Sequence, residues 1–174
     1  MRAAQGSDAV INLIGILKGD FERAHGATAA RIAAAAAASG AAMVQVSAIG
    51  ANAESPSAYG RSKAAGEVAV REAVPTATIL RPSIVFGRED QFINRFAGLL
   101  RMAPVMPVVA PQTRFQPVFV GDVAAAMVAA LADPAKAGQT YELGGPQILS
   151  MRELYEWIAR QTGSVAEYPV DEAP

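Results

Sequence analysis

Short apolar runs alternate along the chain with longer segments of helical character. The first run, residues 9–14, is rich in β-branched side chains, which is typical of a strand buried on both faces of a sheet. Residues 21–39 have the character of a helix, and Gly40 follows as its C-terminal cap. The same reasoning predicts further strands at 42–46, 77–80, 116–120 and 140–143, and further helices at 57–72, 91–101, 122–131 and 151–161.

Parallel pairing is expected for the first three predicted strands, because each is joined to the next by a helical connection. Strand, helix, strand, helix, strand at this spacing indicates an α/β fold. We therefore predict a Rossmann-like doubly wound parallel sheet, followed by a small C-terminal α+β portion.

Composition narrows the class of protein. Hydrophobic residues make up 52% of the 174 residues, too many for a disordered chain. The formal net charge of −1 gives no electrostatic footprint for nucleic acid or an anionic membrane. The absence of cysteine excludes a disulfide framework and thiolate chemistry, and is compatible with a cytoplasmic protein. Residues 32–51 are uncharged over the length of a bilayer, but a helix ending at Gly40 and a buried strand explain them better.

Tyr59 and Lys63 are the first candidates for chemistry. Four residues apart on a predicted helix, they lie on one face, one turn from each other. A nearby ammonium favours the phenolate and lowers the pKa of a tyrosine, which brings acid–base work into range. The same spacing also fits an ordinary pair of surface residues.

Ser47 favours acid–base chemistry at Tyr59 and Lys63 over an ordinary surface pair. It follows a predicted parallel strand, at the edge of an α/β sheet where ligands bind. Its hydroxyl is placed to donate a hydrogen bond to a substrate carbonyl oxygen. The alternative is a serine that ends the strand and satisfies backbone groups of the following loop.

These residues and their neighbours resemble a known family. The run Tyr59 to Lys63, continued by Ala64-Ala65-Gly66-Glu67, is similar to the active-site helix of extended and atypical short-chain dehydrogenases/reductases, which are NAD-dependent epimerase/dehydratase-like proteins. Segments 80–87 and 118–123 also fit this family. Segments 86–96 and 114–118 resemble the branch that contains the nucleotide-binding accessory subunit of respiratory complex I.

The resemblance implies a role for each matching residue. Tyr59 would be the acid–base group, Lys63 would bind the cofactor ribose and lower the pKa of Tyr59, and Ser47 would orient the carbonyl. The cofactor would be NAD or NADP, contacted also by Asn12, Gly15, Pro82 and Ser83. Asn12 also has a plainer reading, a side chain that satisfies a strand end, and Pro82 one that sets a turn.

The resemblance also divides the chain. Residues 1–87 would be the C-terminal part of a Rossmann domain and would carry the serine, tyrosine and lysine. Residues 88–174 would be a substrate-side portion that completes the sheet and is not independent.

A glycine-rich phosphate loop is missing from the sequence. No segment fits Gly-x-Gly-x-x-Gly between a strand and a helix, although dinucleotide-binding folds need it to bring backbone N–H groups to the pyrophosphate. The first predicted strand matches the family's fourth, so we expect that the βαβ half with this loop precedes Met1 and that the chain is a fragment. Segment 9–14 would then have an unpaired edge, and the chain alone would bind the cofactor weakly or not at all.

Two functions remain open at this stage. The first is an NAD(P)-binding protein related to the complex I subunit, which would associate with complex I at the inner membrane. The second is an active NAD(P)-dependent oxidoreductase or epimerase that uses Tyr59, Lys63 and Ser47 on a hydroxyl or carbonyl substrate. His25, the only histidine, is expected to be structural or solvent-facing, because no second ligand at metal-site spacing lies nearby. No metal site is predicted.

Overall fold

The computed structural model describes residues 4–102 and 107–163, and these form two compact units. The first unit contains Met1–Pro82 and Asp122–Leu143. The second contains Ser83–Gly121 and Gly144–Pro174. Each unit is therefore built from two separate stretches of the chain.

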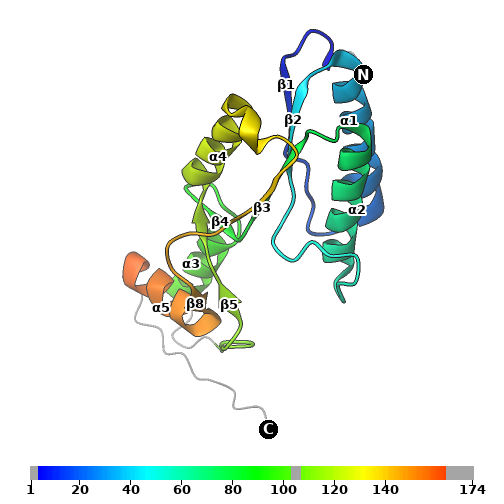
Figure 1. Ribbon diagram of the computed structural model, residues 1–174. Helices are drawn as coiled ribbons and strands as arrows, with labels where there is room; N and C mark the ends of the chain where they lie inside the picture. Colours follow the sequence, from blue (N-terminus) through cyan, green and yellow to red (C-terminus); the bar gives the residue numbers. More distant parts are fainter. Residues whose placement is uncertain (1–3, 103–106, 164–174) are drawn as a thin grey trace. The chain divides into compact units, whose positions relative to one another are not determined.

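The first unit is built on a four-stranded sheet (Figure 1). Its strands are β1 (Ala9–Asn12), β2 (Ala42–Val46), β3 (Thr78–Pro82) and β7 (Thr140–Leu143), in the spatial order β1-β2-β3-β7. Every neighbouring pair is parallel. The predicted α/β class and the parallel pairing are confirmed.

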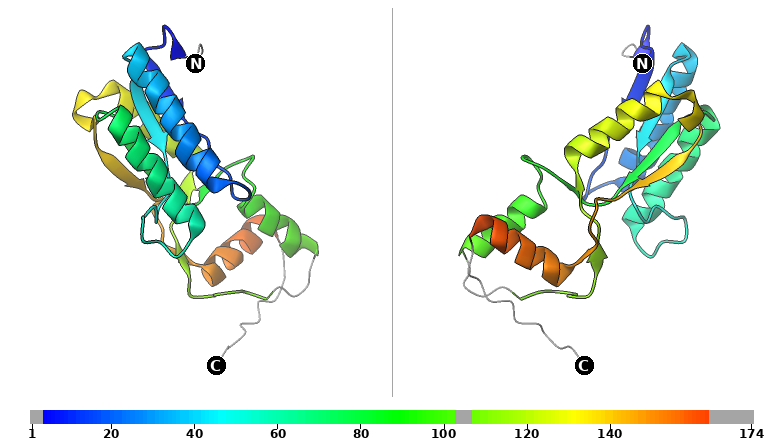
Figure 2. Two further views of the ribbon diagram at one scale, coloured as in Figure 1. Left: turned by 90° about the vertical axis from the view of Figure 1, so that its right-hand side faces the viewer. Right: turned by 60° about the vertical axis from the view of Figure 1, so that its left-hand side comes forward.

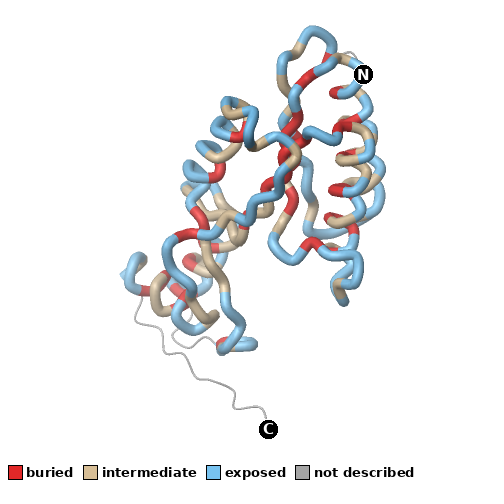
Figure 3. The backbone as a smooth tube through the Cα atoms, in the orientation of Figure 1, coloured by how far each residue is buried: buried red, intermediate tan, exposed pale blue. Residues whose placement is uncertain are grey.

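Helices cover both faces of this sheet (Figure 2). Met43 of β2 packs with α1 (Thr28–Ser39) and α2 (Ala58–Ala73), whereas the adjacent Val44 packs with α4 (Val120–Ala132). Neighbouring residues of a strand point to opposite faces, so the sheet has α1 and α2 on one side and α4 on the other. Buried positions accordingly concentrate on β2, β3 and the inner sides of the helices (Figure 3).

Small residues bring α1 and α2 close together. Ala29, Ala33 and Ala36 recur at helical spacing on the buried side of α1. Gly66 of α2 faces the π-helical turn η2 (Glu22–Ala27) that precedes α1, and a Cβ there would collide with the carbonyl oxygen of His25. The alanine-rich segment is thus a tight helix contact, and it ends as predicted at Gly40, whose φ is 68°.

The second unit packs two helices against short strand pairs. β4 (Val85–Phe86) pairs with β6 (Val118–Phe119) in parallel, and β5 (Arg114–Phe115) pairs with β8 (Leu149–Ser150) in antiparallel orientation. The helices α3 (Ile93–Met102) and α5 (Met151–Thr162) share a core that includes Leu100, Leu154 and Ile158. Ser150 caps α5 together with Glu153 in a reciprocal capping box, which confirms the predicted cap.

Three sequence-based expectations need correction. The strand predicted at 9–14 ends at Asn12 and is an edge strand, with Ile11, Leu13 and Ile14 exposed at 41%, 63% and 42%, so it is not buried on both faces. The strand predicted at 116–120 contains only β6. The helix expected to begin after Asp122 begins at Val120 instead, so Asp122 lies in its first turn.

None of the helices in the described part of the chain is long and apolar enough to cross a membrane. The uncharged stretch 32–51 contains the end of α1, Gly40 and β2, as the sequence indicated.

Candidate active site

The candidate site is formed where β1 and β2 end and α2 begins. Asn12 is the last residue of β1, and Ser47 directly follows β2. Tyr59 and Lys63 lie in the first two turns of α2, which starts after Ser57 in an extended conformation. The Nζ atom of Lys63 is 5.8 Å from the centroid of the Tyr59 ring, so the two side chains share a face as predicted.

Lys63 is buried among backbone groups of the strand ends. Its side chain donates a 3.5 Å hydrogen bond to the carbonyl oxygen of Val46, the last residue of β2. Gly15 lies against the ammonium, since a Cβ at that glycine would be 3.3 Å from Nζ. Burial lowers the pKa of Lys63, and the negative charge of Glu67 opposes this effect. The structure therefore brings Gly15 and Lys63 together with the end of β2.

The pKa of Tyr59 moves in the direction opposite to the one the spacing predicted. Burial raises this pKa above 10, because the phenolate loses its hydration. The ammonium of Lys63 lies 5.8 Å from the centroid of the ring, and at this distance its attraction for the phenolate does not outweigh the desolvation. At neutral pH Tyr59 is therefore a phenol with a proton to give.

Ser47 is a buried hydroxyl without a partner. Its backbone N–H donates to the carbonyl oxygen of Leu80 at 2.7 Å, which fixes its backbone to β3. The residue is 4% exposed, and its Oγ has no hydrogen-bond partner among the described residues. It does not satisfy the following loop, which was the alternative reading. Because buried polar groups are nearly always paired, this oxygen is suited to a ligand.

Asn12 uses its side chain within the chain. Its Nδ2 donates to Gln45 Oε1 at 2.8 Å, and its Oδ1 accepts from the N–H of Ile14 at 3.0 Å. The second bond turns the chain away from β1 and explains why the strand stops there. A contact between Asn12 and a cofactor stays a prediction.

Pro82 and Ser83 lie at the end of β3. Pro82 is buried, and its carbonyl oxygen accepts a 3.1 Å hydrogen bond from the N–H of Ile49 in the loop after β2. Ser83 begins the second unit. The structure thus ties Pro82 to the Ser47 loop, and the contacts of Pro82 and Ser83 with a cofactor stay predictions.

His25 is the residue that the sequence did not connect with the site. It is 3% exposed, its Nε2 lies 3.0 Å from the N–H of Ile16, and its Nδ1 lies 2.9 Å from Ser62 Oγ. The ring stands edge-on to Tyr59 with centroids 5.3 Å apart, and it stacks on Phe21 at 5.6 Å. The only available signal was the four-residue spacing of Phe21 and His25, which places two rings on one helical face.

A bidentate ion pair holds the middle of α2 to the sheet. Arg81 of β3 donates to the two carboxylate oxygens of Glu67 at 2.9 and 2.7 Å. The pair is largely buried, with side-chain exposures of 26% and 10%. These charges hold α2 against β3, and Glu67 lies one helical turn from Lys63.

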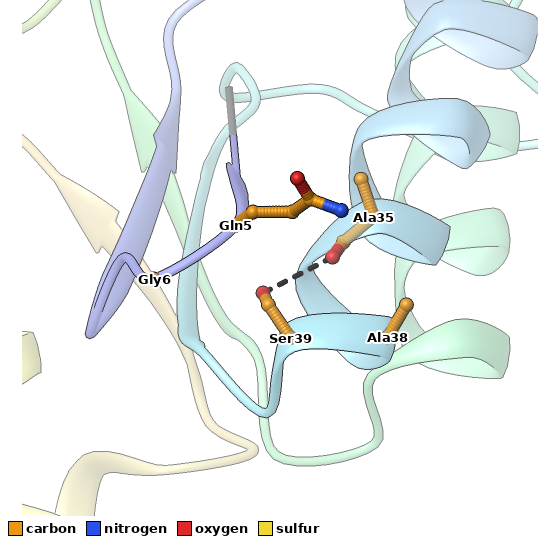
Figure 4. A pocket seen from close by; sticks show the side chains of 5 residues that line it. All are labelled: Gln5, Gly6, Ala35, Ala38 and Ser39. Atoms are coloured by element: carbon orange, nitrogen blue, oxygen red, sulfur yellow. Dashed lines mark hydrogen bonds between the residues drawn. The ribbon is translucent and has the colours of Figure 1, made fainter. Parts of the chain in front are cut away.

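A cavity elsewhere in the first unit is lined by no ionisable side chain. It lies between Gln5-Gly6 and the C-terminal turn of α1, lined also by Ala35, Ala38 and Ser39 (Figure 4). The Ser39 hydroxyl already donates to the carbonyl oxygen of Ala35. This cavity lies beside the segment that leads into β1, whereas Asn12 and Ser47 lie at the opposite ends of the strands.

The family model described as the RmlD substrate binding domain matches residues 22–173. The chain belongs to this family. As a member of the RmlD substrate binding domain family, it is an extended short-chain dehydrogenase/reductase-like protein, in agreement with the resemblance seen in the Tyr59 helix.

Two curated relatives of this RmlD-family chain carry different names. The chain is 43% identical over 158 residues to "NADH dehydrogenase [ubiquinone] 1 alpha subcomplex subunit 9, mitochondrial" of Arabidopsis thaliana. This match covers 86% of the chain and 39% of that protein. It is 37% identical over 132 residues to "Ceramide reductase" of Caulobacter vibrioides, covering 74% of the chain and 42% of that protein. The chain thus spans less than half the length of these relatives.

Solved structures confirm the fold. The dTDP-4-dehydrorhamnose reductase of Bacillus anthracis, solved with NADP, has a TM-score of 0.82 at 20% identity and covers 95% of the chain and 66% of that structure. The dTDP-glucose 4,6-dehydratase DesIV of Streptomyces venezuelae, solved with NAD, has a TM-score of 0.78 at 19% identity and covers 98% and 63%. The predicted Rossmann-like class is confirmed.

Proposed function

We propose that this chain supplies the nicotinamide-side half of an NAD(P)-binding site in a short-chain dehydrogenase/reductase-like protein related to the complex I subunit. The observation that carries the proposal is the unpaired, buried Ser47 Oγ on the strand end next to the Lys63 contact. Relatives solved with NAD and NADP support the choice of ligand.

The residues present fit one end of such a cofactor. Lys63 would bind the ribose hydroxyls through its ammonium, and Gly15 leaves room there because it has no side chain. Ser47 would donate to the oxygen of a carbonyl that lies against the nicotinamide. The residues for the pyrophosphate do not fit, because the sequence has no glycine-rich loop.

Acid–base chemistry follows from the pKa of Tyr59. The nicotinamide, when bound, supplies or accepts the hydride. Tyr59 holds its proton at neutral pH, so it would give that proton to the carbonyl oxygen as the hydride reaches the carbonyl carbon. The product would be an alcohol, and the ammonium of Lys63, 5.8 Å from the ring centroid, would offset only part of the desolvation of the phenolate that remains.

Binding can be tested on this chain with reduced nicotinamide mononucleotide, which lacks the adenylate half. Titration of ¹⁵N-labelled protein is expected to shift the amides of Gly15, Ser47 and Lys63. Lys63→Met should abolish these shifts, whereas Lys136→Met, a change of the same kind far along the chain, should leave them intact. Shifts confined to the Gln5–Ser39 cavity, or none at all, would refute the proposal.

A catalytic role is the second candidate, favoured by the Ser47, Tyr59 and Lys63 arrangement and by similarity to a protein named ceramide reductase. In any form of the protein that turns over a substrate, Tyr59→Phe is expected to abolish turnover and to leave cofactor affinity largely unchanged. Full activity in that variant would show that Tyr59 is not the proton donor.

Respiratory complex I is the partner that the Arabidopsis relative suggests for this chain. The protein would then lie peripherally on the inner membrane rather than free in the cytoplasm. Co-purification with complex I from membranes of the source organism would support this location. A stable monomer with a measurable substrate, recovered only from the soluble fraction, would oppose it.

A further inference from the structure

His25 joins three segments through directed hydrogen bonds. Its Nε2 accepts from the N–H of Ile16, so this nitrogen carries no proton. In a neutral ring the proton is therefore on Nδ1, which donates to Ser62 Oγ at 2.9 Å. The Ser62 hydroxyl in turn donates to the carbonyl oxygen of Tyr59 at 2.8 Å. His25 and Ser62 thus each donate one hydrogen bond and accept one, while Ile16 only donates and the Tyr59 carbonyl only accepts.

The network reaches both sides of the candidate site. Ile16 follows Gly15, which lies against the ammonium of Lys63. Tyr59 stands edge-on to the imidazole and also to Phe21, with centroids 5.3 and 6.0 Å apart. One buried ring thus contacts the segment that carries Gly15 and the side chain of the proton donor.

We propose that His25 is a positioning residue whose neutral, Nδ1-protonated ring latches the segment 13–16 onto α2, and that protonation of the ring opens this latch. A second proton would have to sit on Nε2, where it would point at the N–H of Ile16. Two donors cannot share a hydrogen bond, so the segment must move away. The proposal rests on the proposed function only where it treats Gly15 and Lys63 as a cofactor site.

The charges around the ring keep the latch closed at neutral pH. From α2, the Lys63 ammonium opposes a second cation, and the Tyr59 phenol is uncharged. The segment 13–16 presents only the backbone of Ile16, and the charged residues beside His25 on its own turn, Glu22 and Arg23, are exposed. Burial and Lys63 together lower the pKa of His25, so opening needs acid.

The tautomer can be read directly by NMR. Long-range ¹H–¹⁵N correlation on the His25 ring should show a protonated Nδ1 and an unprotonated Nε2 at about pH 7.5. On acidification, the amides of Gly15 and Ile16 should shift with the same midpoint as the ring. An Nε2-protonated tautomer, or amides that stay fixed while the ring titrates, would overturn the proposal.

Two variants separate positioning from general folding. His25→Gln can accept from Ile16 and donate to Ser62, so it should keep the Gly15 and Ile16 amide shifts and lose their acid titration. His25→Leu should displace those amides, and reduced nicotinamide mononucleotide should bind it about fivefold or more weakly, as expected for the loss of one or two hydrogen bonds. Equal mononucleotide affinity in both variants and the wild type would contradict positioning. If even the wild type does not bind, the proposed function fails, while the tautomer and the amide titration still decide the role of His25.

Discussion

Single glycines decide how closely the helices of the first unit can pack. Gly66 lies in the middle of α2, where glycine costs helix stability relative to alanine. Its position is explained by the His25 carbonyl oxygen, which occupies the space that a Cβ would need. Gly98 of α3 has open space around it, so nothing in the structure requires a glycine there. The two residues are matched in local structure and differ only in surroundings.

Gly66→Ala is therefore expected to destabilise the protein by about 1–3 kcal/mol, the usual cost of overpacking a tight contact. Gly98→Ala should instead stabilise it by about 0.5–1 kcal/mol through helix propensity. Urea denaturation followed by circular dichroism measures both free energies of unfolding. If both substitutions changed stability in the same direction, the close approach of η2 and α2 would be wrong.

At the scale of elements, β1 forms one edge of the four-stranded sheet. The carbonyl oxygen of Asp8 accepts from the N–H of Ala42, so the backbone groups of alternate residues face β2, and those of Ala9 and Ile11 face outward. The sequence carries no charge between Asp8 and Lys18. Edge strands usually have charged or proline residues that prevent pairing with other chains, and this edge has neither.

We expect the protein to self-associate through this edge as its concentration rises. Ile11→Lys should reduce the association, because a lysine on an edge strand opposes strand pairing. Val128→Lys on α4 introduces the same charge at an exposed apolar position and serves as the control. Sedimentation velocity over a concentration series gives the association state. A monomeric wild type, or an equal effect of both variants, would contradict the assignment.

The sequence predicted elements where local signals were strong. Residues 42–46 form a short, mostly apolar run that matches β2, and Gly40 and Ser150 are caps that act locally. The two-residue strands β4, β5 and β8 were not predicted, because so short a pairing has no periodicity. Their existence depends on residues far away in the chain.

The same distinction holds for the site. The spacing of Tyr59 and Lys63 predicted a shared helix face, because a helical turn is a local property. The direction of the Tyr59 pKa and the unpaired state of Ser47 depend on burial, which tertiary packing sets. The partners of His25, Ile16 and Ser62, come from other segments, so no local pattern could connect them.

At the scale of the whole molecule, stability and ligand binding depend on what the chain buries and on what its sequence provides. It buries its only histidine in a neutral state. It provides a strand end with Ser47 and Lys63, and no glycine-rich loop. Each of these features has a measurable consequence.

Stability should fall as the solution becomes acidic. The pKa of His25 in the folded protein lies below its value of about 6.5 in the unfolded chain. Between the two values the unfolded state binds a proton that the folded state does not, so the free energy of unfolding decreases as pH falls through this window and is fully recovered above it. Urea titrations at several pH values measure the slope. His25→Gln should flatten it, and an unchanged slope in that variant would assign the effect to other groups.

Binding of an intact dinucleotide should be weak. A pyrophosphate needs backbone N–H groups from a glycine-rich loop at a helix N-terminus, and the sequence has no such loop. Titration calorimetry of this chain with NADH and NADPH is therefore expected to give little or no heat. A dissociation constant in the micromolar range would show that phosphate binding does not require that loop.

The interleaving of the two units has a consequence for biosynthesis. The chain leaves the first unit after Pro82, enters the second, and returns at Asp122 to add α4 and β7 before leaving again at Gly144. On the ribosome, β3 therefore emerges well before its neighbour β7. The face of β2 and β3 that α4 covers stays exposed to solvent while some forty residues of the other unit are made. The nascent chain would therefore expose apolar strand surface near the ribosome exit. We expect chaperones that bind apolar strands to associate with it during translation.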